Sequence, residues 1–204
     1  MRVALITHTP DPEGVILQAY LSCRHRGEDI ETIRERREDQ HRIRDIFLLQ
    51  HFGLFEHATA TIRFEGVSRS FSHQLVRHRI ASYAQLSMRH VDVEKLDTIV
   101  PPSIAKKPQA ANLFIDAFNY CREVYSLLKD TYGIRKEDAR FIIPIGIETQ
   151  VIVTMNFRSW LHFLKLRTDI SAQWEIREAA GLAWEILKEI APNVFDEVHK
   201  GRWE

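Results

Sequence analysis

The sequence predicts an α+β protein in which a small, mostly antiparallel sheet packs against long helices. Two observations support this fold class. Several segments repeat apolar residues at helical spacing, and the few strand patterns do not alternate with helices in regular βαβ units. The chain has 204 residues, of which 45% are hydrophobic and 27% charged, which is ordinary for a folded domain. We therefore expect residues 1–204 to form a single domain with its own core.

The N-terminal segment predicts one strand and one helix. Residues 3–7 form a short apolar run typical of a buried strand, and Asp11 or its neighbour can cap a helix over about residues 13–23. Residues 24–45 then hold seven basic and seven acidic side chains in interleaved order. They form either a solvated helical face, which the balanced charges favour, or an element that binds anionic parts of a ligand.

The central segment predicts a half-buried strand followed by a helix. Residues 58–67 alternate strictly, with apolar side chains on one face. We expect Gly66 to close this strand and Ser68 to cap a helix that runs to about Arg77. The pair Pro101–Pro102 marks an irregular connection.

The C-terminal half predicts four helices and one strand. Apolar residues recur at intervals of three and four between positions 113 and 128, which indicates a long amphipathic helix that ends near Gly133. Residues 135–141 predict a short helix stopped by Pro144, and residues 148–156 predict a strand rich in β-branched side chains. Two further helices are expected over residues 159–166 and 172–190, the last ended by Pro192.

Charge and cysteine content exclude several classes of protein. Lys plus Arg and Asp plus Glu both number 28, so the chain lacks the global basicity of many nucleic-acid binders. The cysteines Cys23 and Cys121 are too few for a secreted disulfide scaffold, which favours a reduced, cytoplasmic protein. The N-terminal apolar run is too short for a signal sequence or a membrane span. Neither His-Glu-x-x-His nor Cys-x-x-Cys occurs, so we expect no metal site.

The densest polar segment covers residues 77–90. It contains three arginines, two histidines and two serines, and it has neither acidic residues nor lysine. Guanidinium groups held this close together repel one another, and a multivalent anion relieves the repulsion through bidentate hydrogen bonds. The segment therefore predicts a phosphorylated ligand. The alternative is that these arginines pair with the acidic residues of segment 24–45.

Two further segments carry functional side chains. In residues 156–167, Arg158 and His162 are four residues apart and share one helix face, and Arg167 lies at a similar azimuth further along. Residues 51–57 combine aromatic rings with histidines and Glu56. The chain has no Gly-x-Ser-x-Gly elbow, no phosphate-binding Gly-rich loop and no dinucleotide fingerprint, so a nucleotide cofactor would bind in some other way.

Three blocks resemble, in order and spacing, those of the flavin-dependent thymidylate synthases, the ThyX family. They are HFGLFEH (51–57), RHRIASYAQLSMR (77–89) and NFRSWLHFLKLR (156–167). The resemblance covers about residues 45–190 and implies the thymidylate synthase-complementing protein fold. It also implies a cytoplasmic enzyme that uses FAD to methylate dUMP at C5, giving dTMP. The carbon donor would be 5,10-methylenetetrahydrofolate and the reductant NADPH.

The resemblance implies a homotetramer with FAD and nucleotide held between subunits, without nucleic acid or membrane as a partner. It assigns an FAD site and a nucleotide site. The residues carried over to FAD are Gly53, Glu56, Arg77, His78, Arg79, Asn156, Arg158 and His162. Those carried over to the nucleotide are Gln74, Gln85, Leu86, Ser87, Met88, Arg89, Arg140 and Arg167.

Arg167 is the catalytic candidate. Methylation at C5 needs electron density in the uracil ring, and neither cysteine stands in a motif that would add to C6. A guanidinium near N3 and O4 can stabilise the ionised, enolate-like ring electrostatically. Arginine does not readily lose its proton, so we interpret Arg167 as a stabiliser and not as a base. Ser87 is expected to bind and orient the nucleotide.

The chain departs from the family pattern at four positions. Ala84 replaces Asn, Gly53 replaces Ser or Thr, Tyr20 stands where Arg is common, and His90 replaces Tyr. Two alternatives therefore stay open: a relative that methylates UMP, and a catalytically weak nucleotide-binding paralogue. RNA binding through the arginines is disfavoured, because net charge is zero and no stacking platform is evident.

Overall fold

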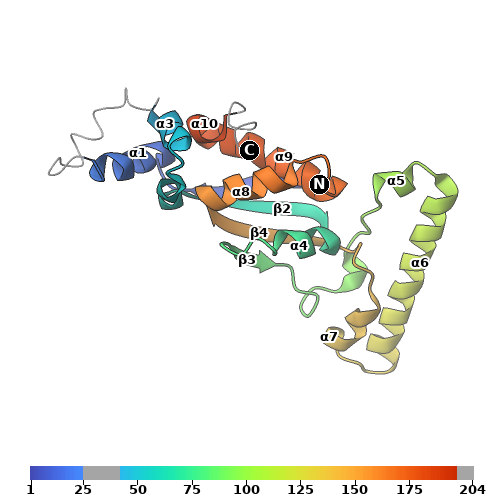
Figure 1. The fold of residues 1–204 in the computed structure, drawn as a ribbon. Coiled ribbons are helices and arrows are strands. Elements are labelled where there is room, and N and C mark those ends of the chain that lie inside the picture. Colours follow the sequence, from blue (N-terminus) through green and yellow to red (C-terminus); the bar gives the residue numbers. More distant parts are fainter. Residues whose placement is uncertain (25–41, 197–204) are drawn as a thin grey trace. The chain divides into compact units, whose positions relative to one another are not determined.

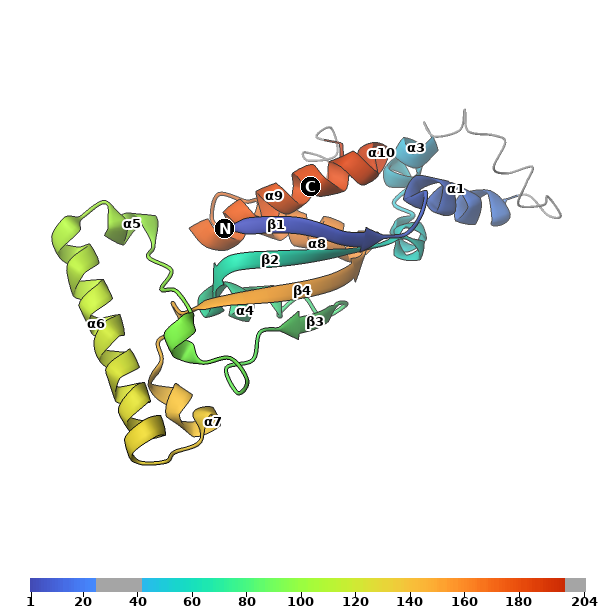
Figure 2. The ribbon, with the colours of Figure 1, turned by 180° about the vertical axis from the view of Figure 1, so that it is seen from behind.

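The computed structural model describes residues 1–24 and 42–196 and has the predicted α+β fold (Figure 1). In this part of the chain, four strands form a small antiparallel sheet in the order β1-β2-β4-β3. Figure 2 shows β1, β2 and β4 side by side. The strands are β1 (Arg2–His8), β2 (Thr59–Ser68), β3 (Ser82–Gln85) and β4 (Glu148–Asn156).

The helices agree closely with the sequence pattern. They are α1 (Pro12–Ser22), α3 (Arg42–Leu48), α4 (Arg69–Leu75), α5 (Pro102–Ala105), α6 (Pro108–Ser126), α7 (Lys136–Ala139), α8 (Phe157–Arg167), α9 (Trp174–Ile190) and α10 (Pro192–Phe195). Short 3-10 helices cover Phe52–His57, Val93–Lys95 and Arg140–Ile142, and a π-helical turn, Leu127–Thr131, extends α6. The interpretation of segment 24–45 falls mostly on residues 25–41, which lie outside the described residues.

The chain divides into two compact units. Unit 1 comprises residues 1–2, 64–75 and 84–151, and unit 2 comprises the described residues of 3–63, 76–83 and 152–204. Each unit contains its own set of the site residues predicted from the sequence.

Unit 2 is organised around helix α8. Asn156 caps the helix by accepting a hydrogen bond from the backbone N–H of Ser159 at 2.8 Å. The apolar side chains Phe157, Trp160 and Leu164 are buried, and the indole N–H of Trp160 donates to the carbonyl of Ala60. In Figures 1 and 2, α8 and α9 lie on one face of β1. Because the apolar face of α8 is buried, Arg158 and His162 lie on the exposed face of the helix, where they can contact a ligand.

The helix start signals were predicted correctly. Asp11 caps α1, with its carboxylate accepting from the backbone N–H of Gly14 at 3.2 Å. Ser68 caps α4, with its hydroxyl accepting from the backbone N–H of Phe71 at 3.0 Å. These short polar residues satisfy backbone donors that a helix leaves unpaired at its first turn.

Three local predictions were wrong. Gly66 does not close its strand: β2 continues to Ser68, and Gly66 lies within it at a φ of +62°, which glycine tolerates. Pro102, expected in an irregular connection, starts the short helix α5, because proline suits the first turn of a helix. The end of α9 at Ile190 agrees with the prediction, and Pro192 then starts α10. Leu113, expected on the buried face of α6, is 73% exposed, whereas Phe118 and Tyr125 are buried.

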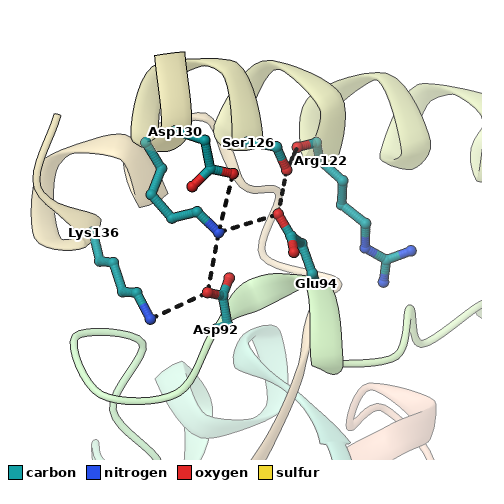
Figure 3. Close-up of polar contacts among 7 residues, drawn as sticks. Asp92, Glu94, Arg122, Ser126, Asp130 and Lys136 are labelled. Atoms are coloured by element: carbon teal, nitrogen blue, oxygen red, sulfur yellow. Dashed lines mark hydrogen bonds and ion pairs between the residues drawn. The ribbon is translucent and has the colours of Figure 1, made fainter. Parts of the chain in front are cut away.

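A polar network in unit 1 links the end of α6 to the segment that follows β3 (Figure 3). The Lys129 ammonium lies 3.1 Å from Asp92 and 3.2 Å from Glu94, and Lys136 lies 3.1 Å from the same oxygen of Asp92. Burial alone raises the pKa of Asp92, but hydrogen bonds and charges from the two lysines outweigh it and hold that pKa below its usual value. The network therefore stabilises the fold above about pH 4.

Lys129→Met is expected to lower the free energy of unfolding by about 2 kcal/mol at pH 7. The reason is that Asp92 and Glu94, with the Lys129 side chain only 15% exposed, lose their shared cation. The difference in the free energy of unfolding between the variant and wild type should shrink as pH falls below about 4, because protonated carboxyl groups no longer form ion pairs with the lysine. Urea unfolding at several pH values measures it. Lys106→Met, at an exposed lysine, is the control, and equal effects of both substitutions would contradict the prediction.

Candidate active site

A cavity of about 660 Å³ opens in unit 2 between residues 77–80 and helix α8. Its lining residues are Arg77, His78, Arg79, Ile80, Arg158, Ser159, His162, Leu166 and Arg167. The structure thus brings two of the three sequence blocks together, as expected from their shared basic and imidazole side chains. Four guanidinium groups around one cavity favour an anionic ligand.

His78 is the most buried polar residue of this cavity, with 8% of its surface exposed. Its Nε2 accepts a hydrogen bond from Nε of Arg167 at 3.1 Å, and its ring meets Phe163 edge to face at 5.1 Å between centroids. Its Nδ1 is buried and has no hydrogen-bond partner among residues 1–24 and 42–196. A buried nitrogen of this kind points to a ligand that completes the site.

Electrostatics keep the His78 imidazole neutral. Burial, followed by the charge of Arg167 and by His162, lowers the pKa of His78 to about 4. The pKa of Arg167 is also lowered, first by burial and then by the charge of Arg77. The arginines of the cavity therefore repel one another within the protein, and binding an anion would relieve that repulsion.

The third sequence block lies beside α8. Arg158 Nη1 donates to the Glu56 carboxylate at 2.5 Å, which connects the 3-10 helix Phe52–His57 to the cavity wall. A side chain added at Gly53 would meet nothing within 4 Å, so the hydroxyl that the family pattern places there is replaced by open space. The side-chain oxygen of Asn156 accepts the hydrogen bond that caps α8.

The residues predicted to bind nucleotide, apart from Arg167, lie in unit 1. Gln85 on β3 donates from Nε2 to the hydroxyl of Ser72 at 2.8 Å and to that of Thr149 at 3.2 Å. Met88 is buried in the hydrophobic cluster of this unit, so any contact it makes with a nucleotide would come from its backbone. Gln74 lies on α4, and its Nε2 donates to the carbonyl of Ser70 at 3.4 Å.

Arg89 and Arg140 share Glu137 as a neighbour. Arg89 Nε lies 2.9 Å from the Glu137 carboxylate, and Arg140 Nε donates to the Glu137 carbonyl at 3.1 Å. The Ser87 hydroxyl accepts from the backbone N–H of Arg89. Helix α7 therefore brings a carboxylate to the predicted nucleotide loop, a feature that the sequence analysis missed.

Arg69 was also missed. It is the first residue of α4, its Nη2 donates to the carbonyl of Leu86 at 3.0 Å, and its Nε is buried without a hydrogen-bond partner among the described residues. Burial and then the charge of Arg140 lower the pKa of Arg69. One signal was available in the sequence: a cation is unfavourable at a helix N-terminus, which suggests that Arg69 has another reason to be there.

Among residues 1–24 and 42–196, no group of three His, Cys, Asp or Glu side chains is arranged to hold a metal ion. In the same residues, no helix has the length and apolar character needed to cross a membrane.

Comparison with known proteins gives consistent results. The family model described as thymidylate synthase complementing protein matches residues 4–193. The flavin-dependent thymidylate synthase of Geobacter sulfurreducens is 40% identical over 98% of this chain and 88% of its own length. That of Thermococcus onnurineus is 41% identical over 95% of this chain and 80% of its own length.

A solved structure has the same fold. It is the flavin-dependent thymidylate synthase ThyX of Helicobacter pylori in complex with FAD and dUMP, which matches with a TM-score of 0.75. The match covers 97% of this chain and 99% of the other, at 21% sequence identity.

Proposed function

The chain belongs to the thymidylate synthase complementing protein family, and we propose that it is an FAD-dependent enzyme that methylates dUMP at C5 to give dTMP. The carbon donor is 5,10-methylenetetrahydrofolate and the reductant is NADPH. The observation that supports this most directly is the cavity that gathers Arg77, Arg79 and Arg158 beside the buried Nδ1 of His78.

These residues fit FAD. A pyrophosphate needs fixed cationic donors, and in this chain arginines take the place of a glycine-rich loop. The neutral imidazole of His78 offers an N–H at Nδ1 that no group in the described part of the chain accepts. The residues that we assign to FAD are Gly53, Glu56, Arg77, His78, Arg79, Asn156, Arg158 and His162. When bound, FAD supplies the reducing equivalents of the reaction.

The nucleotide is assigned to the remaining residues. Arg89 and Arg140 hold the phosphate by charge-assisted hydrogen bonds, and Gln74, Gln85 and Ser87 orient the nucleoside. The backbones of Leu86 and Met88 complete the loop. Arg89 must exchange its Glu137 partner for the phosphate, and because the Arg89 side chain is 60% exposed this exchange costs little.

Arg167 carries the catalytic role in this proposal. In its ionised, enolate-like form the uracil ring carries negative charge on its oxygens and has a nucleophilic C5. A guanidinium aimed at those oxygens stabilises this reactive form, which attacks the methylene carbon, more than it stabilises the neutral ring of bound dUMP. Arg167 remains a cation throughout, so it moves no proton.

The proposal is tested by the reaction itself. Purified protein is mixed with FAD, NADPH, methylenetetrahydrofolate and dUMP, and dTMP is quantified, with each component omitted in turn and with UMP in place of dUMP. We expect the purified protein to show a flavin absorbance spectrum and to form dTMP only when NADPH, methylenetetrahydrofolate and dUMP are all present. Dependence on added FAD is expected of the apoprotein, from which the flavin has been removed. A flavin-containing protein that methylates UMP and not dUMP would favour the relative that acts on UMP. A flavin-containing protein that methylates neither nucleotide would favour the catalytically weak nucleotide-binding paralogue.

We also propose that the protein is a cytoplasmic homotetramer whose 204 residues act as one catalytic domain. Support comes from large side chains of unit 1 that stand exposed. They are Leu113 (73%), Tyr120 (67%), Tyr132 (72%) and Phe141 (86%). Exposed side chains of this size are common where subunits meet. Both cysteines are free, which suits a reducing compartment.

The assembly proposal predicts a particle of about four times 23.9 kDa in solution. Light scattering coupled to size-exclusion chromatography measures the mass, and activity is followed on dilution. If residues of one site come from several subunits, specific activity should fall as the tetramer dissociates. A monomer that keeps full activity on dilution would rule out shared sites.

A further inference from the structure

We propose that His78 is a positioning residue for Arg167: its neutral imidazole accepts the hydrogen bond from Arg167 Nε and so fixes the plane of the guanidinium. The inference deepens the proposed function and rests on it, because it concerns how the proposed catalytic cation is aimed. It adds a second role to a residue that the family resemblance assigns only to FAD.

The geometry of an arginine makes this contact effective. The guanidinium is a rigid planar group, so a hydrogen bond at Nε fixes the orientation of both Nη groups. The distance of 3.1 Å between Arg167 Nε and His78 Nε2 is that of an ordinary hydrogen bond. Arg167 is the last residue of α8, and the hydrogen bond to His78 restricts the rotamers of its long side chain.

His78 is itself held on several sides. Phe163 packs edge to face against its ring at 5.1 Å, and the His162 ring lies 5.9 Å away. The Tyr83 hydroxyl donates to the His78 carbonyl oxygen at 2.6 Å, which fixes the backbone. A ring fixed in this way can hold the guanidinium of Arg167 in one orientation.

The protonation state of His78 is the one that the contact requires. An imidazolium carries protons on both nitrogens and cannot accept from Arg167, whereas the neutral ring with its proton on Nδ1 can. Burial, Arg167 and His162 lower the pKa of His78 to about 4, so the ring is neutral at pH 7. The charged groups that share the cavity are Arg77, Arg79, Arg158 and Arg167. All of them favour the neutral ring.

The test uses two substitutions that differ in one respect. Glutamine can place an acceptor near the position of Nε2, whereas the shorter asparagine reaches only the position of Nδ1. We expect His78→Gln to form dTMP faster in a single turnover than His78→Asn at saturating FAD and dUMP, although it lacks the N–H at the position of Nδ1 that we assign to FAD. His78→Asn should lose about ten- to a hundredfold, because a misdirected group can cost up to about a hundredfold in rate.

A double-mutant cycle separates positioning from a structural or FAD-binding role. Arg167→Lys removes Nε, so there is nothing left for His78 to orient. In that background, His78→Asn should change the saturated single-turnover rate by less than about twofold. The equilibrium Kd for dUMP, the FAD content and the melting temperature are measured for each variant, and the rate loss of His78→Asn should exceed its loss of dUMP affinity.

The outcomes are distinct. Rate losses that multiply in the double variant, equal rates for the Gln and Asn variants, or a His78→Asn rate equal to wild type would each overturn the positioning role. Asparagine keeps an N–H near the position of Nδ1, so His78→Asn should retain FAD at saturation. A rate loss of His78→Asn that tracks its loss of FAD would also overturn the positioning role. A wild-type protein that forms no dTMP overturns the proposed function, and this inference with it.

Discussion

Replacing Arg167 by alanine is expected to lower the single-turnover rate of dTMP formation at saturating dUMP by about a hundred- to a thousandfold. This is the usual cost of removing one preorganised electrostatic group from a transition state. Arg167 is partly buried and lies at a cavity with three other arginines, so its charge acts where water screens it less than in bulk solution. The affinity for dUMP should fall by a smaller factor, since charge develops on the ring mainly during reaction.

Arg167→Lys should recover only part of this rate. Lysine keeps the positive charge but loses the planar fork and the Nε that donates to His78. The reduction of FAD by NADPH is measured separately for both variants, because a slow reductive step would imitate the predicted loss.

Arg89→Ala is the matched contrast. In the proposal Arg89 holds the phosphate, which does not change during the reaction, so its loss should weaken dUMP binding and leave the saturated rate near wild type. Each variant is therefore measured both by equilibrium binding and by single turnover. Equal losses of affinity and no change in the saturated rate for Arg167→Ala would show that Arg167 is an ordinary ligand contact.

Local signals in the sequence were sufficient to predict most of the fold. The alternation of residues 58–67 and the β-branched run at 148–156 correspond to β2 and β4, because each strand has one buried face. Asp11 and Ser68 were found as caps because their side chains act within three residues of their own position. Leu113 was misplaced because helical periodicity shows that a face is apolar but not what covers it.

The site was predictable to a different extent. The cluster of arginines without acids in residues 77–90 predicts an anion site from local sequence alone. The contacts that tune the site connect distant residues: Arg167 to His78 across 89 positions, and Arg89 to Glu137 across 48. Such pairs have no periodicity and no short-range spacing, so only the folded chain reveals them. Arg69 is the exception, since its unfavourable place at a helix start was visible beforehand.

Retention of FAD should depend strongly on the arginines at positions 77 and 79. Each charge-assisted hydrogen bond that is lost costs about 1.5–3 kcal/mol, so Arg77→Ala and Arg79→Ala should each weaken FAD binding by about ten- to a hundredfold. Both side chains line the cavity that we assign to FAD. The flavin-to-protein absorbance ratio after purification, followed by titration of the apoprotein with FAD, measures the loss.

Arg2→Ala is the control for this prediction, because Arg2 is 78% exposed and pairs with Glu65 at 3.7 Å outside the cavity. It should purify with the same flavin content as wild type. Arg77→Ala has a second effect in the same direction, since it removes a charge that repels Arg167. That relief should stabilise the FAD-free protein and so weaken FAD binding further, whereas Arg79→Ala should not raise the melting temperature of the apoprotein. If both cavity variants purify with full flavin, as Arg2→Ala is expected to do, the cavity between residues 77–80 and α8 does not hold the cofactor.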